Sequence, residues 1–120
     1  MTDQELLELA AKAAGYEKIE YNDLKGSMLD IRYGRDEAIW NGEDYWNPLV
    51  DDCEALRLAV KLGLFVDIYD TEVVVGWVVN ENFSSMKTLN QPKVNDPYAA
   101  TRRAIVRAAA EIGKSMEVTK

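Results

Sequence analysis

The densest group of side chains that could bind a metal ion or take part in catalysis consists of three carboxylates, Asp51, Asp52 and Glu54. Oxygen-only sites for Mg²⁺ or Ca²⁺ need several converging carboxylates, usually from different segments, and Glu43 or Asp44 from the preceding loop would complete such a set. The Asp-x-x-Glu spacing is also that of a capping box, in which the Asp side chain accepts a hydrogen bond from the backbone N–H of the Glu three residues later. We therefore expect a helix cap, with the metal site as the alternative, and we predict no cofactor.

The only cysteine, Cys53, lies inside this acidic group, so the chain has no internal disulfide. A cysteine nucleophile normally needs a neighbouring general base, usually histidine, and the sequence has no histidine. Phosphate-binding glycine loops, dinucleotide fingerprints and paired cysteine ligands are also missing from the sequence. We expect Cys53 to be a small, partly buried packing residue, and we predict that the protein is not an enzyme. Hydrolysis by carboxylates with a divalent metal stays open as a third hypothesis.

The loop before these carboxylates combines acidic and large aromatic side chains. Its members are Trp40, Glu43, Asp44, Tyr45 and Trp46. Large aromatic residues anchor many binding interfaces, and an acidic surface attracts a basic protein surface. The same aromatic residues can instead cover the edge of the core, as buried aromatics commonly do. Both interpretations stay open, and the loop is the first candidate binding site.

The second candidate site consists of Arg102 and Arg103, near the start of the last expected helix. Guanidinium groups at a helix start bind phosphate or carboxylate groups well. Arginines on a helix more commonly form a solvated face that pairs in part with acidic residues of the same molecule. Arg107, for example, is spaced to pair with Glu111 one turn later.

The formal net charge of −7 is concentrated in the first half of the chain. Residues 1–60 contain 6 Lys or Arg and 14 Asp or Glu, whereas residues 61–120 contain 8 and 7. Binding to a nucleic-acid backbone needs clustered positive charge, so we expect none, and an acidic surface also keeps a protein soluble. No apolar run approaches the roughly 20 residues that span a bilayer, and the N-terminus lacks the features of a signal peptide. These features predict a cytoplasmic protein without membrane contact.

Hydrophobic periodicity predicts one α+β domain over residues 1–120. Helices are expected at 3–14, 51–62 and 97–113 and strands at 28–33, 37–40, 64–69 and 72–79. Gly113 should end the last helix, and residues 80–96 should form a loop that hides at most one irregular strand. The helix over 51–62 is apolar around most of its circumference and should be the most buried. The order αββαββα predicts a mostly antiparallel sheet of about four strands, sandwiched between helices.

Three segments resemble a family of small phage and prophage proteins. Residues 46–63, WNPLVDDCEALRLAVKLG, are similar to its W-N-P-L-x-D-D-x-x-A-L-R-L-A-V-x-L stretch. Residues 96–113 look like its closing helix and residues 5–15 like its opening helix, whereas Cys53 stands where we expect glycine or another small residue. The family is the phage ABA-sandwich domain, named for a sheet held between helical layers. The resemblance implies this fold, a phage or prophage origin and the cytoplasm of a bacterial host, but it implies no activity.

Two hypotheses on function rank before metal-assisted hydrolysis. The leading one is a non-enzymatic phage accessory protein that binds a host or phage protein through the acidic aromatic loop. The alternative is a small-ligand, nucleotide-like binding or sequestering protein. Its pocket would lie under residues 80–96, with Arg102 and Arg103 as phosphate donors. The sequence predicts neither the identity of the ligand or partner nor the oligomeric state.

Overall fold

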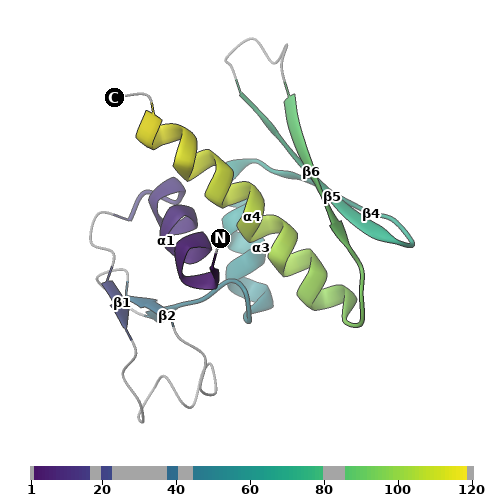
Figure 1. The fold of residues 1–120 in the computed structure, drawn as a ribbon, viewed down its shortest axis with the longest axis horizontal. Coiled ribbons are helices and arrows are strands. Elements are labelled where there is room, and N and C mark those ends of the chain that lie inside the picture. Colours follow the sequence, from purple (N-terminus) through teal and green to yellow (C-terminus); the bar gives the residue numbers. More distant parts are fainter. Residues whose placement is uncertain (1, 17–19, 23–37, 41–44, 80–85, 119–120) are drawn as a thin grey trace.

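The computed structural model describes residues 2–16, 20–22, 38–40, 45–79 and 86–118. Its helices are α1 (Asp3–Ala13), α3 (Asp52–Leu62) and α4 (Pro97–Val118), and its strands are β1 (Glu20–Asn22), β2 (Ala38–Trp40), β3 (Tyr45–Trp46), β4 (Phe65–Ile68), β5 (Glu72–Val78) and β6 (Met86–Pro92). The fold is therefore α+β, as predicted (Figure 1). No helix within the described residues has the length and hydropathy that crossing a membrane requires.

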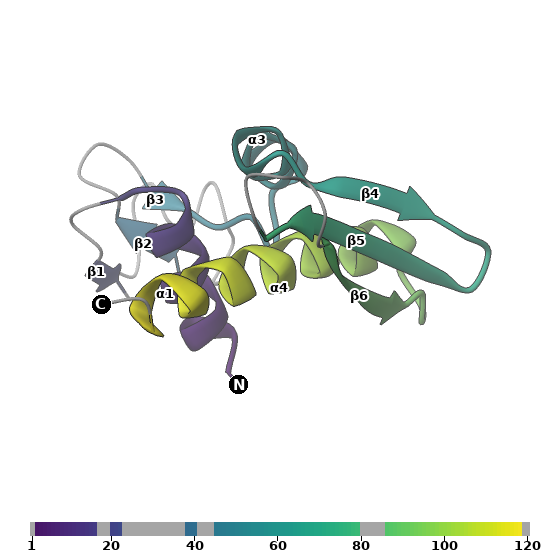
Figure 2. The same ribbon diagram turned by 90° about the horizontal axis from the view of Figure 1, so that it is seen from above.

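The strands form two separate antiparallel sheets, in the orders β1-β2-β3 and β4-β5-β6. The sheets lie at opposite ends of the molecule (Figure 2). The prediction of about four strands in the order αββαββα was therefore wrong, because three described strands precede α3 and three more separate α3 from α4. The expected strand at 28–33 lies outside the described residues.

Strand β6 occupies seven residues of the segment 80–96, which was expected to be a loop hiding at most one irregular strand. Its sequence, MKTLNQP, has little intrinsic strand preference. It forms because it pairs with β5 over seven positions, from Glu72 opposite Pro92 to Val78 opposite Met86. Tertiary pairing overrides the weak local signal in this segment.

Helix α4 is the centre of the fold and contacts α1, α3, β5 and β6. It does not end at Gly113 but continues to Val118. A Cβ atom at Gly113 would lie 2.0 Å from the backbone oxygen of Leu9 in α1. The glycine therefore permits a close crossing of two helices, and the prediction of a helix stop at this residue was wrong.

Helix α3 is less buried than its apolar sequence predicts. Its buried residues are Ala55, Leu58 and Ala59, whereas Leu56 and Val60 are largely exposed. Cys53 is exposed too, against the expectation of a partly buried residue. Only one stripe of a helix can meet a single neighbour, and α3 packs chiefly on α4 (Figure 2).

The β4-β5-β6 sheet is covered by a helix on one face. Val73, Val75 and Trp77 of β5 are buried there, and α4 runs along this face (Figure 1). Phe65 and Met86 belong to the opposite face by register, and both are about half exposed. In the described part of the chain this sheet is therefore not sandwiched between helices.

Candidate ligand-binding cavity

The structure describes the acidic aromatic loop of the first hypothesis only in part. Its one described side chain, Trp46, is only 5 % exposed. The Trp46 ring meets the ring of Tyr16 edge to face, with 5.3 Å between the ring centroids. Trp46 is therefore a core residue. The backbones of Trp40 and Tyr45 pair between β2 and β3, whereas their side chains and residues 43–44 are not described.

The carboxylates at the start of α3 point to separate partners. Asp51 accepts from the backbone N–H of Glu54 at 3.1 Å, as a helix cap should. The Glu54 carboxylate accepts from the backbone N–H of Asn47 at 2.7 Å, and Asp52 forms an ion pair with Arg102 at 2.6 Å. The predicted cap is confirmed. Among the described residues, no group of three or more His, Cys, Asp and Glu side chains is arranged to hold a metal ion.

The structure separates Arg102 from Arg103, which the sequence placed in one site. Arg102 donates from Nε to the Leu49 backbone oxygen at 2.8 Å and from Nη1 to Asp52. Its side chain is 17 % exposed, so Arg102 joins α4 to the start of α3. Arg103, about 100° further round α4, lines a cavity instead.

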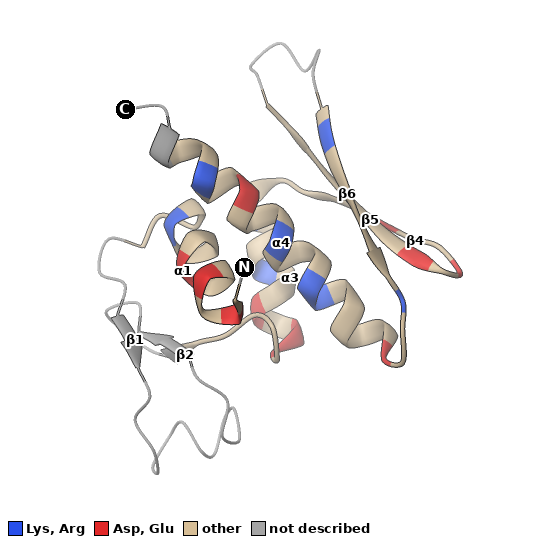
Figure 3. Ribbon diagram, viewed as in Figure 1, with Lys and Arg blue, Asp and Glu red and all other residues tan. Residues whose placement is uncertain are grey.

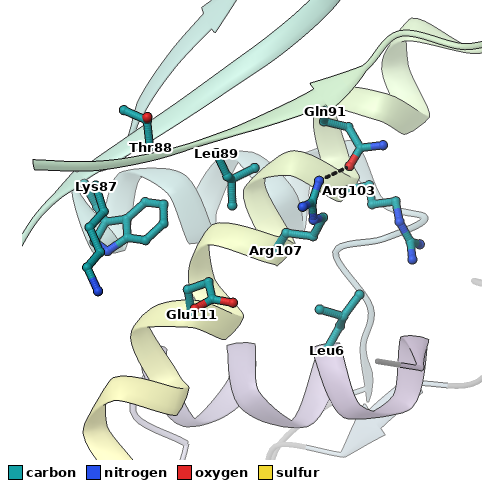
Figure 4. A pocket seen from close by; sticks show the side chains of 9 residues that line it. Leu6, Lys87, Thr88, Leu89, Gln91, Arg103, Arg107 and Glu111 are labelled. Atoms are coloured by element: carbon teal, nitrogen blue, oxygen red, sulfur yellow. Dashed lines mark hydrogen bonds between the residues drawn. The ribbon is translucent and has the colours of Figure 1, made fainter.

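This cavity has a volume of about 730 Å³. It lies between β5 and β6, α4 and α1 (Figure 4), and we call it the α4–β6 cavity. Its lining residues are Leu6, Trp77, Lys87, Thr88, Leu89, Gln91, Arg103, Arg107 and Glu111.

Helix and strand periodicity bring these side chains together. Arg103, Arg107 and Glu111 follow one another at intervals of four residues, so they form a single row along α4, about 6 Å apart. On β6, Lys87, Leu89 and Gln91 alternate with outward-facing residues and share one face of the sheet. The row on the helix thus faces the row on the strand.

Hydrogen bonds hold one arginine of this row against the strand. Arg107 Nη1 donates to Gln91 Oε1 at 2.7 Å and to the Asn90 backbone oxygen at 3.2 Å (Figure 4). Within the described residues no ion pair joins Arg107 to Glu111, although the sequence spacing predicts one. The Arg107 guanidinium is therefore fixed at the wall of the cavity by β6.

The cavity is positively charged in an acidic protein. Lys87 and Arg103 lie toward opposite ends of it with Arg107 between them (Figure 4). Among the described residues, Glu111 is the one carboxylate in its lining. Arg103 Nη1 also pairs with Asp3 at 3.0 Å, across side chains that are 39 % and 63 % exposed. Acidic residues are found instead on α1, at the start of α3 and in the β4–β5 hairpin (Figure 3).

Sequence reasoning found Arg103 but missed most of the cavity. Trp77 was expected only as a strand residue, and Lys87 and Gln91 fell in the expected loop. The row of Arg103, Arg107 and Glu111 was visible in the sequence as a spacing of four. What it faced depended on β6, which the local sequence does not predict.

No protein-family model, curated protein or solved structure matches this chain. The function must therefore be inferred from the residues of the cavity. The resemblance to the phage ABA-sandwich domain stays a prediction.

Proposed function

We propose that this protein binds a small anionic ligand in the α4–β6 cavity. The main support is the gathering of Lys87, Arg103 and Arg107 around one cavity in a chain with a net charge of −7. A concave site lined by charge of one sign raises the local concentration of the opposite ion. A volume of about 730 Å³ also lies within the usual range for small-molecule sites.

The hydrogen bonds of Arg107 favour this function. A guanidinium group has five N–H donors in a fixed plane, and within the described structure only Nη1 of Arg107 is engaged. The remaining donors are available to a carboxylate or phosphate, which arginine binds with two parallel hydrogen bonds. Because β6 already holds the side chain, ligand binding costs less conformational entropy.

The apolar lining defines the rest of the ligand. Leu6, Leu89 and Trp77 contribute hydrophobic walls next to the charged groups. Small-molecule sites commonly combine an apolar lining with a few polar groups that fix the orientation of the ligand. The ligand we propose therefore carries an anionic group on an organic body.

This proposal develops the small-ligand alternative of the sequence analysis. The resemblance to the phage ABA-sandwich domain supports a wider proposal: a phage or prophage accessory protein that sequesters or carries its ligand in the bacterial host cytoplasm. The protein-contact hypothesis loses Trp46 as an exposed anchor, because this side chain is buried.

Isothermal titration calorimetry with inorganic phosphate, a nucleoside monophosphate and butanoate tests the proposal. We expect at least one of them to bind the wild type, and the double variant Lys87→Gln plus Arg107→Gln to bind it at least about tenfold more weakly. A hydrogen bond to a charged group contributes about 1.5–3 kcal/mol, and each 1.36 kcal/mol corresponds to tenfold in affinity.

Arg57→Gln plus Lys114→Gln is the matched control. Both residues are exposed and neither lines the cavity, so this variant removes two positive charges elsewhere. Its affinity should equal that of the wild type. Equal weakening by the control, or no binding of any of the three anions to the wild type at millimolar concentration, would contradict the proposal.

A further inference from the structure

The β4-β5-β6 sheet has one edge at which the backbone has no partner among the described residues. Strand β4 pairs with β5 alone and lies at the outer border of the sheet (Figure 2). At the other edge, the Asn90 backbone oxygen of β6 accepts a hydrogen bond from Arg107 of α4 at 3.2 Å. An uncovered strand edge carries N–H and C=O groups that can pair with another chain.

Alternation along β4 identifies these groups. The Tyr69 N–H donates to the Glu72 oxygen at 2.8 Å, so Tyr69 is bonded toward β5. In an antiparallel pair, alternate residues of a strand bond to the same neighbour. Val66 and Ile68 therefore direct their N–H and C=O groups away from β5, toward the uncovered side.

One face of β4 is apolar up to this edge. Val66 and Ile68 are opposite Val75 and Val73 in the register, so they share the face of the sheet that α4 covers. Ile68 is nevertheless 62 % exposed. A strand added to this edge would place its own side chains next to Val66 and Ile68 and continue the apolar face.

The other face of β4 and the turn that follows it are acidic. Asp67 is on this face, and Asp70 and Glu72 follow at the turn into β5. Residues 64–79 contain these three carboxylates and no Lys or Arg. Lys93 donates from Nζ to a backbone oxygen of the hairpin, which leaves three carboxylates against one ammonium group. The hairpin therefore attracts positive charge.

The same charge disfavours a second copy of this chain at the edge. In a two-fold pairing, the register that engages both Val66 and Ile68 of each copy puts Asp67 directly opposite its counterpart. Like charges directly opposite each other destabilise a strand pair. In a register centred on Val66, Ile68 would need the Leu64 N–H, which already donates to the Ala59 oxygen at 2.9 Å.

We propose that the β4 edge binds an extended polypeptide segment in which basic and apolar residues alternate. The segment adds to the sheet as an antiparallel strand. Its apolar side chains continue the face of Val66 and Ile68, and its basic side chains meet Asp67 and Asp70. The inference goes beyond the proposed function, because none of the β4 residues lines the α4–β6 cavity.

A blocked heptapeptide of alternating lysine and valine, KVKVKVK, tests the inference. It is titrated into the protein, and amide hydrogen exchange is followed by NMR. When about nine tenths of the protein carries peptide, exchange at Val66 and Ile68 should be about tenfold slower, since only the free fraction exchanges. Two control peptides should give no such protection: KKVVVKK, which has the same composition without the alternation, and EVEVEVE, which reverses the charge.

Ile68→Pro tests the backbone pairing directly. Proline removes an N–H that faces away from β5, and proline is tolerated at a sheet edge. Ile68→Ala is the matched control, because it also loses the isoleucine side chain but keeps the N–H. We expect Ile68→Pro to bind KVKVKVK about fivefold more weakly than Ile68→Ala, the equivalent of about 1 kcal/mol for one hydrogen bond.

Equal binding of KVKVKVK and KKVVVKK would overturn the inference, because charge alone would then explain the association. Equal affinities of the two Ile68 variants, or protection confined to amides outside β4, would overturn it too. If Ile68→Pro does not fold, as checked by circular dichroism, the exchange of Val66 and Ile68 in the wild type decides. Each of these results leaves anion binding in the α4–β6 cavity standing, so the two proposals fail separately.

Discussion

Two sides of the same helix, α4, are packed in opposite ways. Against α1 the helix comes so close that a Cβ atom at Gly113 would lie 2.0 Å from the Leu9 backbone oxygen. Against β6 the long side chains of Arg103, Arg107 and Glu111 line a cavity of about 730 Å³. The difference shows that small residues allow elements to pack closely, whereas long side chains leave a cavity between them.

Small side chains line the side of α4 that packs on α1, which we call the closed side. We call the side that faces the α4–β6 cavity the open side. Val106, Ala109 and Ala110 are buried and share the face of Gly113, because they precede it by seven, four and three residues. Close approach maximises dispersion contacts between the two backbones. We infer that stability is concentrated on this side of α4 and ligand binding on the other.

Gly113→Ala is the strongest test of the closed side. The new methyl group meets backbone atoms of Leu9 that cannot rotate away, so α1 and α4 must separate. We expect the free energy of unfolding to fall by about 3 kcal/mol, at the upper end for overpacking. Urea unfolding measures the change. In an exposed helix the same substitution stabilises by about 1 kcal/mol, so the expected sign is opposite to that of helix propensity.

Gly76→Ala is the matched control in β5. Its Cβ atom would meet the Met86 Sδ atom at 3.2 Å and the Thr88 Cγ2 atom at 3.3 Å. Both are side-chain atoms that can move, so the loss should stay within about 1 kcal/mol, the size of ordinary tolerated core changes. If the two glycine substitutions lowered the free energy of unfolding equally, α4 would not be packed unusually closely against α1.

The sequence predicts the helix starts and the fold class better than it predicts how the two sides of α4 are packed. The starts of the helices follow from local signals, such as the Asp51 cap, and the α+β class follows from periodicity. Gly113 looks like a helix stop in the sequence, because its closeness to Leu9 arises only when α1 packs on α4. A local pattern cannot distinguish a glycine that ends a helix from one that admits a neighbouring helix.

The cavity was less predictable because β6 supplies one wall. This strand is stabilised by pairing with β5 rather than by its own residues, so Lys87 and Gln91 were expected in a loop. The direction in which each arginine side chain points could not be predicted from the local sequence either. Arg102 and Arg103 are neighbours in sequence, yet the 100° turn between them sends one to α3 and the other to the cavity.

Arg107→Met tests the hydrogen bonds that hold the open side in place. Methionine keeps an apolar stem but loses the donors to the Asn90 oxygen and to Gln91. We expect stability to fall by about 1 kcal/mol, as for an ordinary hydrogen bond. Amide hydrogen exchange in β6 should accelerate while exchange in α1 stays unchanged. Unaltered exchange in β6 would show that Arg107 does not hold the strand.

Arg103→Gln should have the smallest effect on stability. Its ion pair with Asp3 joins side chains that are 39 % and 63 % exposed, and such pairs contribute about 0.2–1 kcal/mol at most. Arg102→Gln is the matched comparison on the next residue. It breaks hydrogen bonds to the Leu49 oxygen and to Asp52 from a side chain that is only 17 % exposed. The loss of stability measured by urea unfolding should therefore be larger, about 1–3 kcal/mol.

Anion titrations should show the reverse order, with affinity lowered by Arg103→Gln and unchanged by Arg102→Gln. If Arg102→Gln weakened anion binding as much as Arg103→Gln, the charge of α4 as a whole would be responsible, and the open side would have no binding role of its own.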